Sequence, residues 1–145
     1  MIAFRNVAAT HKMAGFTLIE LLVVLTILGL LAGLVGPRVL KYLGGAKTDT
    51  AELQIEEFGA SLDLFHLEVG RYPTTEEGLG ALVNQPAGVN NWHGPYVKKN
   101  DIPADPWGNP YHYRSPGQYG DYDLYSLGRD NIDGGEGEDS DIVSW

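Results

Sequence analysis

Hydrophobic residues dominate one stretch near the start of the chain, FTLIELLVVLTILGLLAGLVG, from Phe16 to Gly36. As a helix these 21 residues rise about 30 Å, which is enough to cross the hydrocarbon core of a bilayer. A secretory signal has a shorter apolar stretch, with its cleavage site after it. Here the small residue Gly15 precedes the stretch, so cleavage there would leave the apolar helix at the new N-terminus. The pattern predicts a leader over residues 1–15 and a transmembrane helix over residues 16–37.

Small residues and a proline interrupt this apolar segment near its end. Gly29, Gly33 and Gly36 follow one another at intervals of four and three, a spacing that lets helices approach closely in a membrane. Pro37 removes a backbone hydrogen bond and therefore kinks or loosens the helix. The alternative is that a single span tolerates these glycines without using them.

A second helical pattern, amphipathic rather than wholly apolar, runs from about Thr48 to Val69. Apolar residues recur at intervals of three and four, which is typical of one helix face packed on a core. They are Ile55, Phe58, Leu62, Phe65 and Val69. Gly70 is predicted to cap the helix at its C-terminus, while the pair Gly44-Gly45 is a place where helical continuity could break. Packing beneath a globular head is favoured over binding a separate partner.

The rest of the chain predicts a small α+β head, which together with the amphipathic stretch makes up residues 38–145. Thr74 and Glu77 have the spacing of a capping box, so a short helix is expected to follow them. The segments YHYRS (111–115) and YDLYSL (122–127) alternate and predict an antiparallel hairpin, with DIVSW (141–145) as a third strand.

Charge is divided unevenly along the chain. Residues 1–47 carry five Lys/Arg and one acid, a net charge of +4, whereas residues 48–145 carry five Lys/Arg and 18 acids, a net charge of −13. A head this acidic repels phosphate backbones, so nucleic acid is excluded as a partner. The absence of cysteine excludes disulfides, thiolate metal sites and a thiol nucleophile.

Enzyme signatures are weak. Ser126, His112 and Asp123 could form a nucleophilic triad on paper, but no G-x-S-x-G elbow surrounds the serine. His66 and His93 lack the H-E-x-x-H spacing that brings two imidazoles together on one helical face. We therefore expect a protein that is not an enzyme.

Glu20 contradicts a plain membrane anchor, because it places a carboxylate one turn inside the apolar segment. Such a charge costs several kcal/mol unless it is paired. After cleavage at Gly15, the free amine of Phe16 in one subunit could meet Glu20 of a neighbour and fix the stagger of parallel helices. The alternative is that Glu20 stays hydrated among the headgroups.

The C-terminal segment is rich in glycine and acids. Residues 130–141 contain six carboxylates and no base: Asp130, Asp133, Glu136, Glu138, Asp139 and Asp141. Such a segment either stays a solvated acidic tail or is ordered by calcium, which prefers carboxylate and carbonyl oxygens. The spacing does not fit an EF-hand, and composition alone leaves both alternatives open.

The hexapeptide GFTLIE (15–20) resembles the processing motif of the type IV pilin and pseudopilin family. The resemblance implies cleavage between Gly15 and Phe16 by a prepilin peptidase, N-methylation of Phe16, and a role for Glu20 in filament assembly. It also implies a pilin-like fold, with a long, partly transmembrane N-terminal helix packed on a small antiparallel sheet.

Within this family the head resembles the major pseudopilins of bacterial type II secretion, through GRYPTTEEGLGALV (70–83), DPWGNPYHY (105–113) and DLYSLGRD (123–130). That resemblance implies a structural calcium ion in the C-terminal loop. The implied ligands are the side chains of Asp130, Asp139 and Asp141 and the carbonyl groups of Leu127 and Ile132.

The same resemblance implies a function in protein secretion. It predicts a subunit anchored once in the bacterial inner membrane, with its head in the periplasm, that polymerises into a helical pseudopilus and pushes folded proteins toward the outer-membrane secretin. Expected partners are further copies of the chain, minor pseudopilins, the inner-membrane assembly platform and prepilin peptidase. The alternatives are a type IV pilus or competence pilin, or a membrane-anchored periplasmic binding module.

Overall fold

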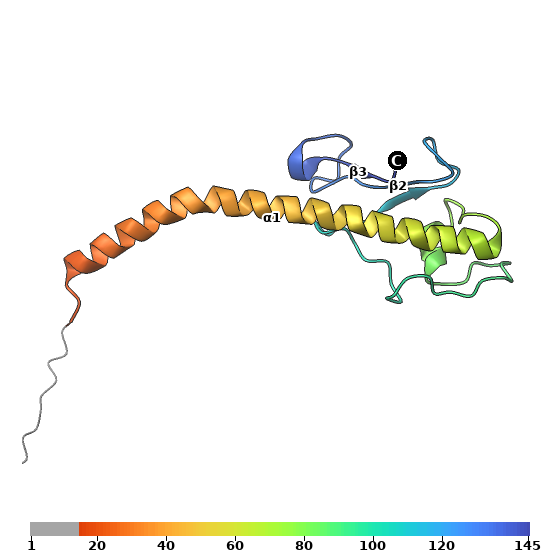
Figure 1. Ribbon diagram of the computed structural model, residues 1–145, viewed down its shortest axis with the longest axis horizontal. Helices are drawn as coiled ribbons and strands as arrows, with labels where there is room; N and C mark the ends of the chain where they lie inside the picture. Colours follow the sequence, from red (N-terminus) through yellow and green to blue (C-terminus); the bar gives the residue numbers. More distant parts are fainter. Residues whose placement is uncertain (1–14) are drawn as a thin grey trace, which may run out of the picture. The chain divides into compact units, whose positions relative to one another are not determined.

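The computed structural model describes residues 15–145. It contains the long helix α1 (Leu18–Val69) and the short 3₁₀ helices η1 (Gly78–Leu82) and η2 (Gly137–Asp139). The three strands are β1 (His112–Arg114), β2 (Asp123–Ser126) and β3 (Ile142–Val143) (Figure 1). Residues through Val39 form one unit and Leu40–Trp145 another. The predicted leader lies outside the described residues except for Gly15.

Helix α1 is continuous over 52 residues. It includes Pro37, and it passes through Gly44-Gly45 without the break that the glycine pair could have introduced. The helix ends where it was predicted to end. Gly70 has φ +85° and its N–H donates to the carbonyl oxygen of His66 at 2.8 Å, which satisfies one of the last helical carbonyl groups.

The predicted apolar stripe of α1 forms the core of the head. Ile55, Phe58, Leu62 and Phe65 are each at most 4% exposed, and Val69 packs at the edge of the same cluster. Their partners come from η1, from the segment just before β1, and from β2 and β3, and include Leu79, Leu82, Tyr111, Leu124 and Ile142. Burial of each large side chain contributes about 1.5–3 kcal/mol, so this stripe holds the sheet and the loops on the helix.

The capping box at Thr74 is confirmed. The Thr74 N–H donates to Glu77 Oε2 at 2.8 Å, and the Glu77 N–H donates to Thr74 Oγ1 at 3.3 Å. The structure that follows is the 3₁₀ helix η1 rather than an α-helix. Arg71 donates to both carboxylate oxygens of Glu77, at 2.7 Å each, and this pairing lowers the pKa of Glu77.

The sheet is antiparallel with strand order β1-β2-β3, as the alternating segments predicted, although each strand is shorter than its segment. Tyr113 is paired with Leu124, and Leu124 is buried toward the core. His112 is paired with Tyr125 and Tyr125 with Val143 on the opposite face. A long helix packed on a small antiparallel sheet confirms the predicted α+β, pilin-like fold class.

Candidate functional site

The N-terminal part of α1 exposes an apolar surface. Helix α1 is the one helix within residues 15–145 that is long and apolar enough to cross a membrane. No residue of its most apolar stretch is buried. Phe16 and Leu18 are 86% and 88% exposed. This part of α1 is therefore not packed in the core of the described structure, and its apolar surface is available to lipid or to other helices.

Glu20 has partners within its own chain. Both the N–H and the hydroxyl group of Thr17 donate to Glu20 Oε2 at 2.8 Å, while the Glu20 N–H donates to Thr17 Oγ1 at 3.3 Å. This is a second capping box, and it closes the N-terminus of α1. Sequence reasoning missed it although the T-x-x-E spacing was readable. The hydrogen bonds orient Glu20 but do not neutralise its charge.

The C-terminal acidic loop, residues 127–141, is ordered by hydrogen bonds to its own backbone. Asp130 Oδ1 accepts from the Ile132 N–H at 3.1 Å, and Asp141 Oδ2 accepts from the Gly134 N–H at 2.9 Å. Asp139 is paired with Arg129, whose Nε and Nη2 donate at 2.9 and 3.0 Å. Arg129 immediately precedes the acidic run and supplies the base that residues 130–141 lack.

The DPWGN turn braces the start of this loop. Asp105 is buried, and its Oδ1 accepts from the N–H groups of Trp107 and Asn109 at 3.1 and 2.8 Å. Its Oδ2 accepts from the buried Ser126 hydroxyl at 2.6 Å, and the Asn109 side chain donates to the Gly128 carbonyl at 2.8 Å. The turn therefore fixes the chain at the point where β2 ends and the acidic loop begins.

Gly128 is required at that point for two reasons. Its φ is +66°, in the left-handed region, and an added Cβ would lie 2.8 Å from the carbonyl oxygens of Glu138 and Ser140. These contacts are with backbone, which cannot move aside cheaply. Gly128 thus lets the two ends of the loop approach each other.

The loop offers carboxylate and carbonyl oxygens, which are the ligand types that a hard cation prefers. Asp141 Oδ1 is buried and has no hydrogen-bond partner, which is costly for a carboxylate oxygen unless a cation lies against it. Within residues 15–145, no three His, Cys, Asp or Glu side chains gather as a metal cluster. A site here would therefore depend on backbone carbonyl oxygens as well as carboxylates, which calcium accepts.

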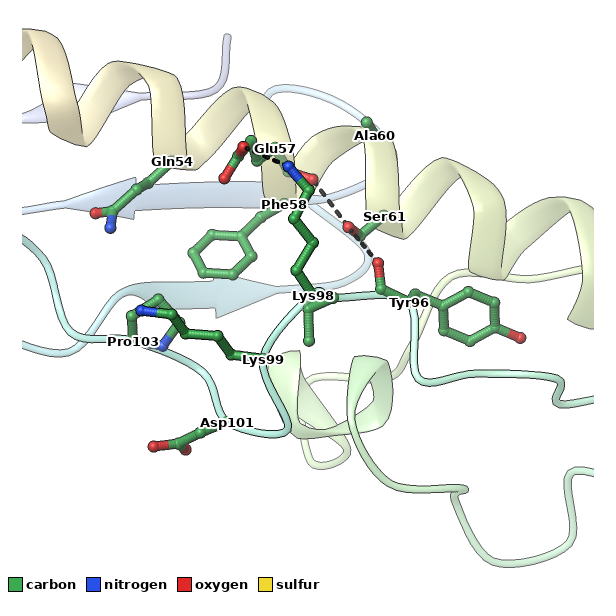
Figure 2. A pocket seen from close by; sticks show the side chains of 11 residues that line it. Gln54, Glu57, Phe58, Ala60, Ser61, Tyr96, Lys98, Lys99, Asp101 and Pro103 are labelled. Atoms are coloured by element: carbon green, nitrogen blue, oxygen red, sulfur yellow. Dashed lines mark hydrogen bonds and ion pairs between the residues drawn. The ribbon is translucent and has the colours of Figure 1, made fainter.

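A groove lies between α1 and the segment 96–103 (Figure 2). Its volume is about 400 Å³, and its lining residues are Gln54, Glu57, Phe58, Ala60, Ser61, Tyr96, Val97, Lys98, Lys99, Asp101 and Pro103. The Ser61 hydroxyl donates to the Tyr96 carbonyl at 3.0 Å, and Lys98 Nζ lies 3.9 Å from Glu57 Oε1. Sequence reasoning did not single out a site at these lysines, which share the rim of the groove with the acids Glu57 and Asp101, beside an apolar floor.

The three residues that could form a nucleophilic triad, Ser126, His112 and Asp123, each have other partners. The Ser126 hydroxyl donates to Asp105, the His112 ring stacks on Tyr125 at 5.0 Å, and Asp123 pairs with Arg114 at 2.8 Å. The serine hydroxyl therefore has no imidazole base, and the arrangement does not support nucleophilic catalysis at Ser126.

Comparisons with known proteins agree with this geometry. Residues 38–145 match the family described as type II secretion system (T2SS), protein G, and residues 10–36 match the prokaryotic N-terminal methylation motif. The type II secretion system core protein G of Pseudomonas aeruginosa is 47% identical over 139 residues, covering 93% of this chain and 96% of that protein. Its counterpart in Vibrio cholerae is 43% identical, covering 93% of each chain.

A solved structure is similar as well. The major pseudopilin from the type 2 secretion system of enterohaemorrhagic Escherichia coli is 35% identical, with a TM-score of 0.59, over 70% of this chain and 88% of that chain. The match to residues 38–145 and the identity to full-length relatives together assign the family. The chain belongs to the type II secretion system protein G family.

Proposed function

We propose that the chain is the major structural subunit of a type II secretion pseudopilus, a helical filament that helps to push folded proteins through the outer-membrane secretin. The observation that carries the proposal is the apolar N-terminal part of α1, whose most apolar stretch has no buried residue, in a chain whose residues 38–145 match the protein G family. Lipid covers that helix before assembly, and neighbouring copies cover it in the filament. The chain acts as a structural subunit and not as an enzyme.

Processing begins at the N-terminus. Prepilin peptidase cleaves between Gly15 and Phe16, and Phe16 is then N-methylated. The methylation-motif match over residues 10–36 supports this step. Before assembly the subunit crosses the inner membrane once through residues 16–37, with the leader in the cytoplasm and the head in the periplasm.

Assembly uses the charge of Glu20. The capping box already satisfies the Thr17 N–H, but a carboxylate surrounded by Leu18, Ile19 and Leu21 still lacks a counter-charge. The methylated amine of Phe16 from an adjacent copy supplies one, and the pairing sets the axial stagger. Minor pseudopilins and the inner-membrane assembly platform are the further partners, and nucleic acid is not one.

The head offers surfaces for packing against neighbouring subunits. Leu53 and Leu67 of α1 are 61% and 80% exposed, outside the buried stripe. The groove beside Lys98 and Lys99 adds a concave surface with an apolar floor and charges of both signs at its rim. These features support polymerisation over a monomeric binding module on a simple anchor. The match of residues 38–145, which include the whole head, to the protein G family favours a pseudopilin over a type IV pilus or competence pilin.

Calcium is the structural ion of the acidic loop. Its proposed ligands are the carboxylates of Asp141, Asp130 and Asp139 and the carbonyl groups of Leu127 and Ile132. The three carboxylates do not gather as a cluster within residues 15–145, so they would have to converge on the ion. The buried, unpartnered Asp141 Oδ1 supports this assignment. When bound, the ion offsets the negative charge of the loop and stabilises the folded head by mass action.

The assembly role is tested with three variants that separate the charge of Glu20 from its capping role. Glu20→Ala removes both, Glu20→Gln removes the charge and keeps an oxygen that accepts from Thr17, and Thr17→Ala keeps the charge and weakens the cap. Filaments are counted by electron microscopy in bacteria that lack their own copy of the major subunit. We expect both Glu20 variants to fail to polymerise and Thr17→Ala to polymerise.

Wild-type assembly by Glu20→Gln would contradict the charge pairing. Mass spectrometry of the mature wild-type chain checks the processing separately, since it should find N-methyl-Phe16 at the terminus. An intact leader on filament-forming protein would contradict the cleavage step.

A further inference from the structure

Gly44 is buried in a helix segment whose neighbours are exposed. Leu43 and Gly45 on either side lie open, and Gly44 is the first buried residue of α1. What covers it is the side chain of Glu138, from η2 in the acidic loop. A Cβ built on Gly44 would lie 2.6 Å from Glu138 Oε1 and 2.7 Å from both Cδ and Cγ. The carboxylate and its stem therefore lie against the helix backbone, in what we call the Glu138–Gly44 contact.

Other residues hold Glu138 in this position. Trp107 Nε1 donates to Glu138 Oε2 at 3.1 Å, and Arg129 Nη1 lies 3.7 Å from Oε1. The Glu138 carbonyl also accepts from the Arg129 N–H at 2.8 Å. The side chain is not a flexible surface group that can swing aside without loss, because leaving Gly44 would break the bond with Trp107.

Two of the carboxylates expected to bind the cation lie in this turn or just after it. Glu138 precedes Asp139 in η2, and Asp141 follows two residues later. Ordering the loop around an ion therefore fixes the backbone from which Glu138 projects. In return, seating Glu138 on the helix holds Asp139 and Asp141 in one arrangement.

The helix is intrinsically weak at this point. Each glycine in a helix interior is about 1 kcal/mol less favourable than alanine, and Gly44 and Gly45 are adjacent. A contact that depends on the helical form of Gly44 offsets part of that weakness. The glycine at position 44 is also what makes the contact possible, since any side chain there would displace Glu138.

We propose that the Glu138–Gly44 contact couples the acidic loop to α1, so that cation binding in the loop and helical order at Gly44-Gly45 stabilise each other. The two effects are equal by thermodynamic linkage. If cation binding stabilises the helix at Gly44-Gly45 by some factor, helical order there strengthens cation binding by the same factor. The ion dependence rests on the proposed calcium site, whereas the contact itself does not.

Gly44→Ala and Gly45→Ala form a matched pair that tests the coupling. Both gain the same intrinsic helix propensity, but a Cβ at Gly45 meets nothing within 4 Å. In the full chain in detergent micelles, we expect Gly44→Ala to lower the calcium affinity measured by calorimetric titration by roughly tenfold. Gly45→Ala should leave the affinity unchanged or raise it slightly. Equal affinities in the two variants would overturn the proposal.

A double-mutant cycle locates the effect in Glu138. With Glu138→Ala as background the position over Gly44 is vacant, so adding Gly44→Ala should no longer lower the affinity. A further loss in that background would mean that Gly44 acts through something other than Glu138, and would also overturn the proposal.

Hydrogen exchange separates failure of the contact from failure of the calcium site. Without calcium, Glu138→Ala should speed amide exchange at residues 44–48 several-fold relative to wild type. If wild type shows no response to calcium but Glu138→Ala still speeds exchange, the calcium site is wrong and the contact stands. Unchanged exchange in Glu138→Ala would refute the contact.

Discussion

Arg129 holds the carboxylate of Asp139 through two hydrogen bonds, 2.9 Å from Nε to Oδ1 and 3.0 Å from Nη2 to Oδ2. The pairing raises the pKa of Arg129, so the guanidinium stays charged. A cation that uses both Asp139 oxygens has to displace Arg129, and one that uses a single oxygen has to share Asp139 with it. Arg129 would therefore compete with a calcium ion at the proposed site, and it stabilises the loop when no ion is bound.

Replacing Arg129 with Gln should strengthen calcium binding. The variant removes a positive charge that repels the ion and frees Asp139, so we expect about a fivefold gain in affinity at low salt and less at high salt. The melting temperature in chelator should fall, because Asp139 loses its partner. Calorimetric titration and thermal unfolding measure the two effects. A weaker affinity in Arg129→Gln would show that the order Arg129 gives the loop, through Asp139 and Glu138, outweighs its competition with the ion.

Asp123 makes the head sensitive to acid. Burial alone would raise its pKa, but the N–H groups of Gln118 and Tyr119 and the Arg114 guanidinium donate to the carboxylate and lower the pKa below its usual 3.8. Stability from this group is present above the usual pKa and is lost as pH falls through the lowered folded-state value. Glu77, whose pKa is also lowered, adds a loss of the same sign.

Asp123→Asn should therefore flatten the acid limb of the stability curve. We expect the variant to be less stable than wild type at pH 7 in urea unfolding, and to lose less of its stability between pH 4 and pH 2. Asp121→Asn, at an exposed neighbouring position, is the control and should keep the wild-type slope. Parallel curves for Asp123→Asn and wild type would contradict the role of Asp123.

Local sequence patterns predicted most of the fold. The spacing of Ile55, Phe58 and Leu62 is a property of one helix face, and the Thr74-x-x-Glu77 box closes within four residues. Both can be read without knowing the tertiary structure, because the interactions that produce them are local. The same signature at Thr17 and Glu20 was equally readable but was interpreted only as a charge problem.

Contacts distant in sequence could not be predicted. Glu138 and Gly44 are separated by most of the chain, and their contact exists only because the DPWGN turn and Gly128 fix the path of the acidic loop. Composition identified the loop as acidic and a candidate for calcium. It could not show that Arg129 neutralises Asp139, because the pairing depends on the loop closing on itself.

The buried stripe of α1 dominates the stability of the head. Leu62 is fully buried, so Leu62→Ala should lower the free energy of unfolding by about 2–5 kcal/mol. Leu67, also on α1, is 80% exposed, and Leu67→Ala should change the stability of the monomer by less than about 0.5 kcal/mol. Thermal or urea unfolding of the detergent-solubilised chain measures both. Similar losses in the two variants would contradict the assignment of the core face.

Asp141 should respond to substitution with opposite signs in the presence and absence of calcium. Its Oδ1 is buried without a partner, whereas its Oδ2 accepts from the Gly134 N–H. Without a cation, an unpartnered buried carboxylate oxygen is costly, so Asp141→Asn should raise the melting temperature in chelator because it removes the charge. With calcium the same variant should lose the stabilisation that wild type gains, since it lacks the anionic ligand. Asp133→Asn, at an exposed position of the same loop, is the control and should keep the calcium response. If Asp141→Asn retains the full calcium-dependent rise in melting temperature, Asp141 is not a ligand and its orphaned oxygen needs another explanation.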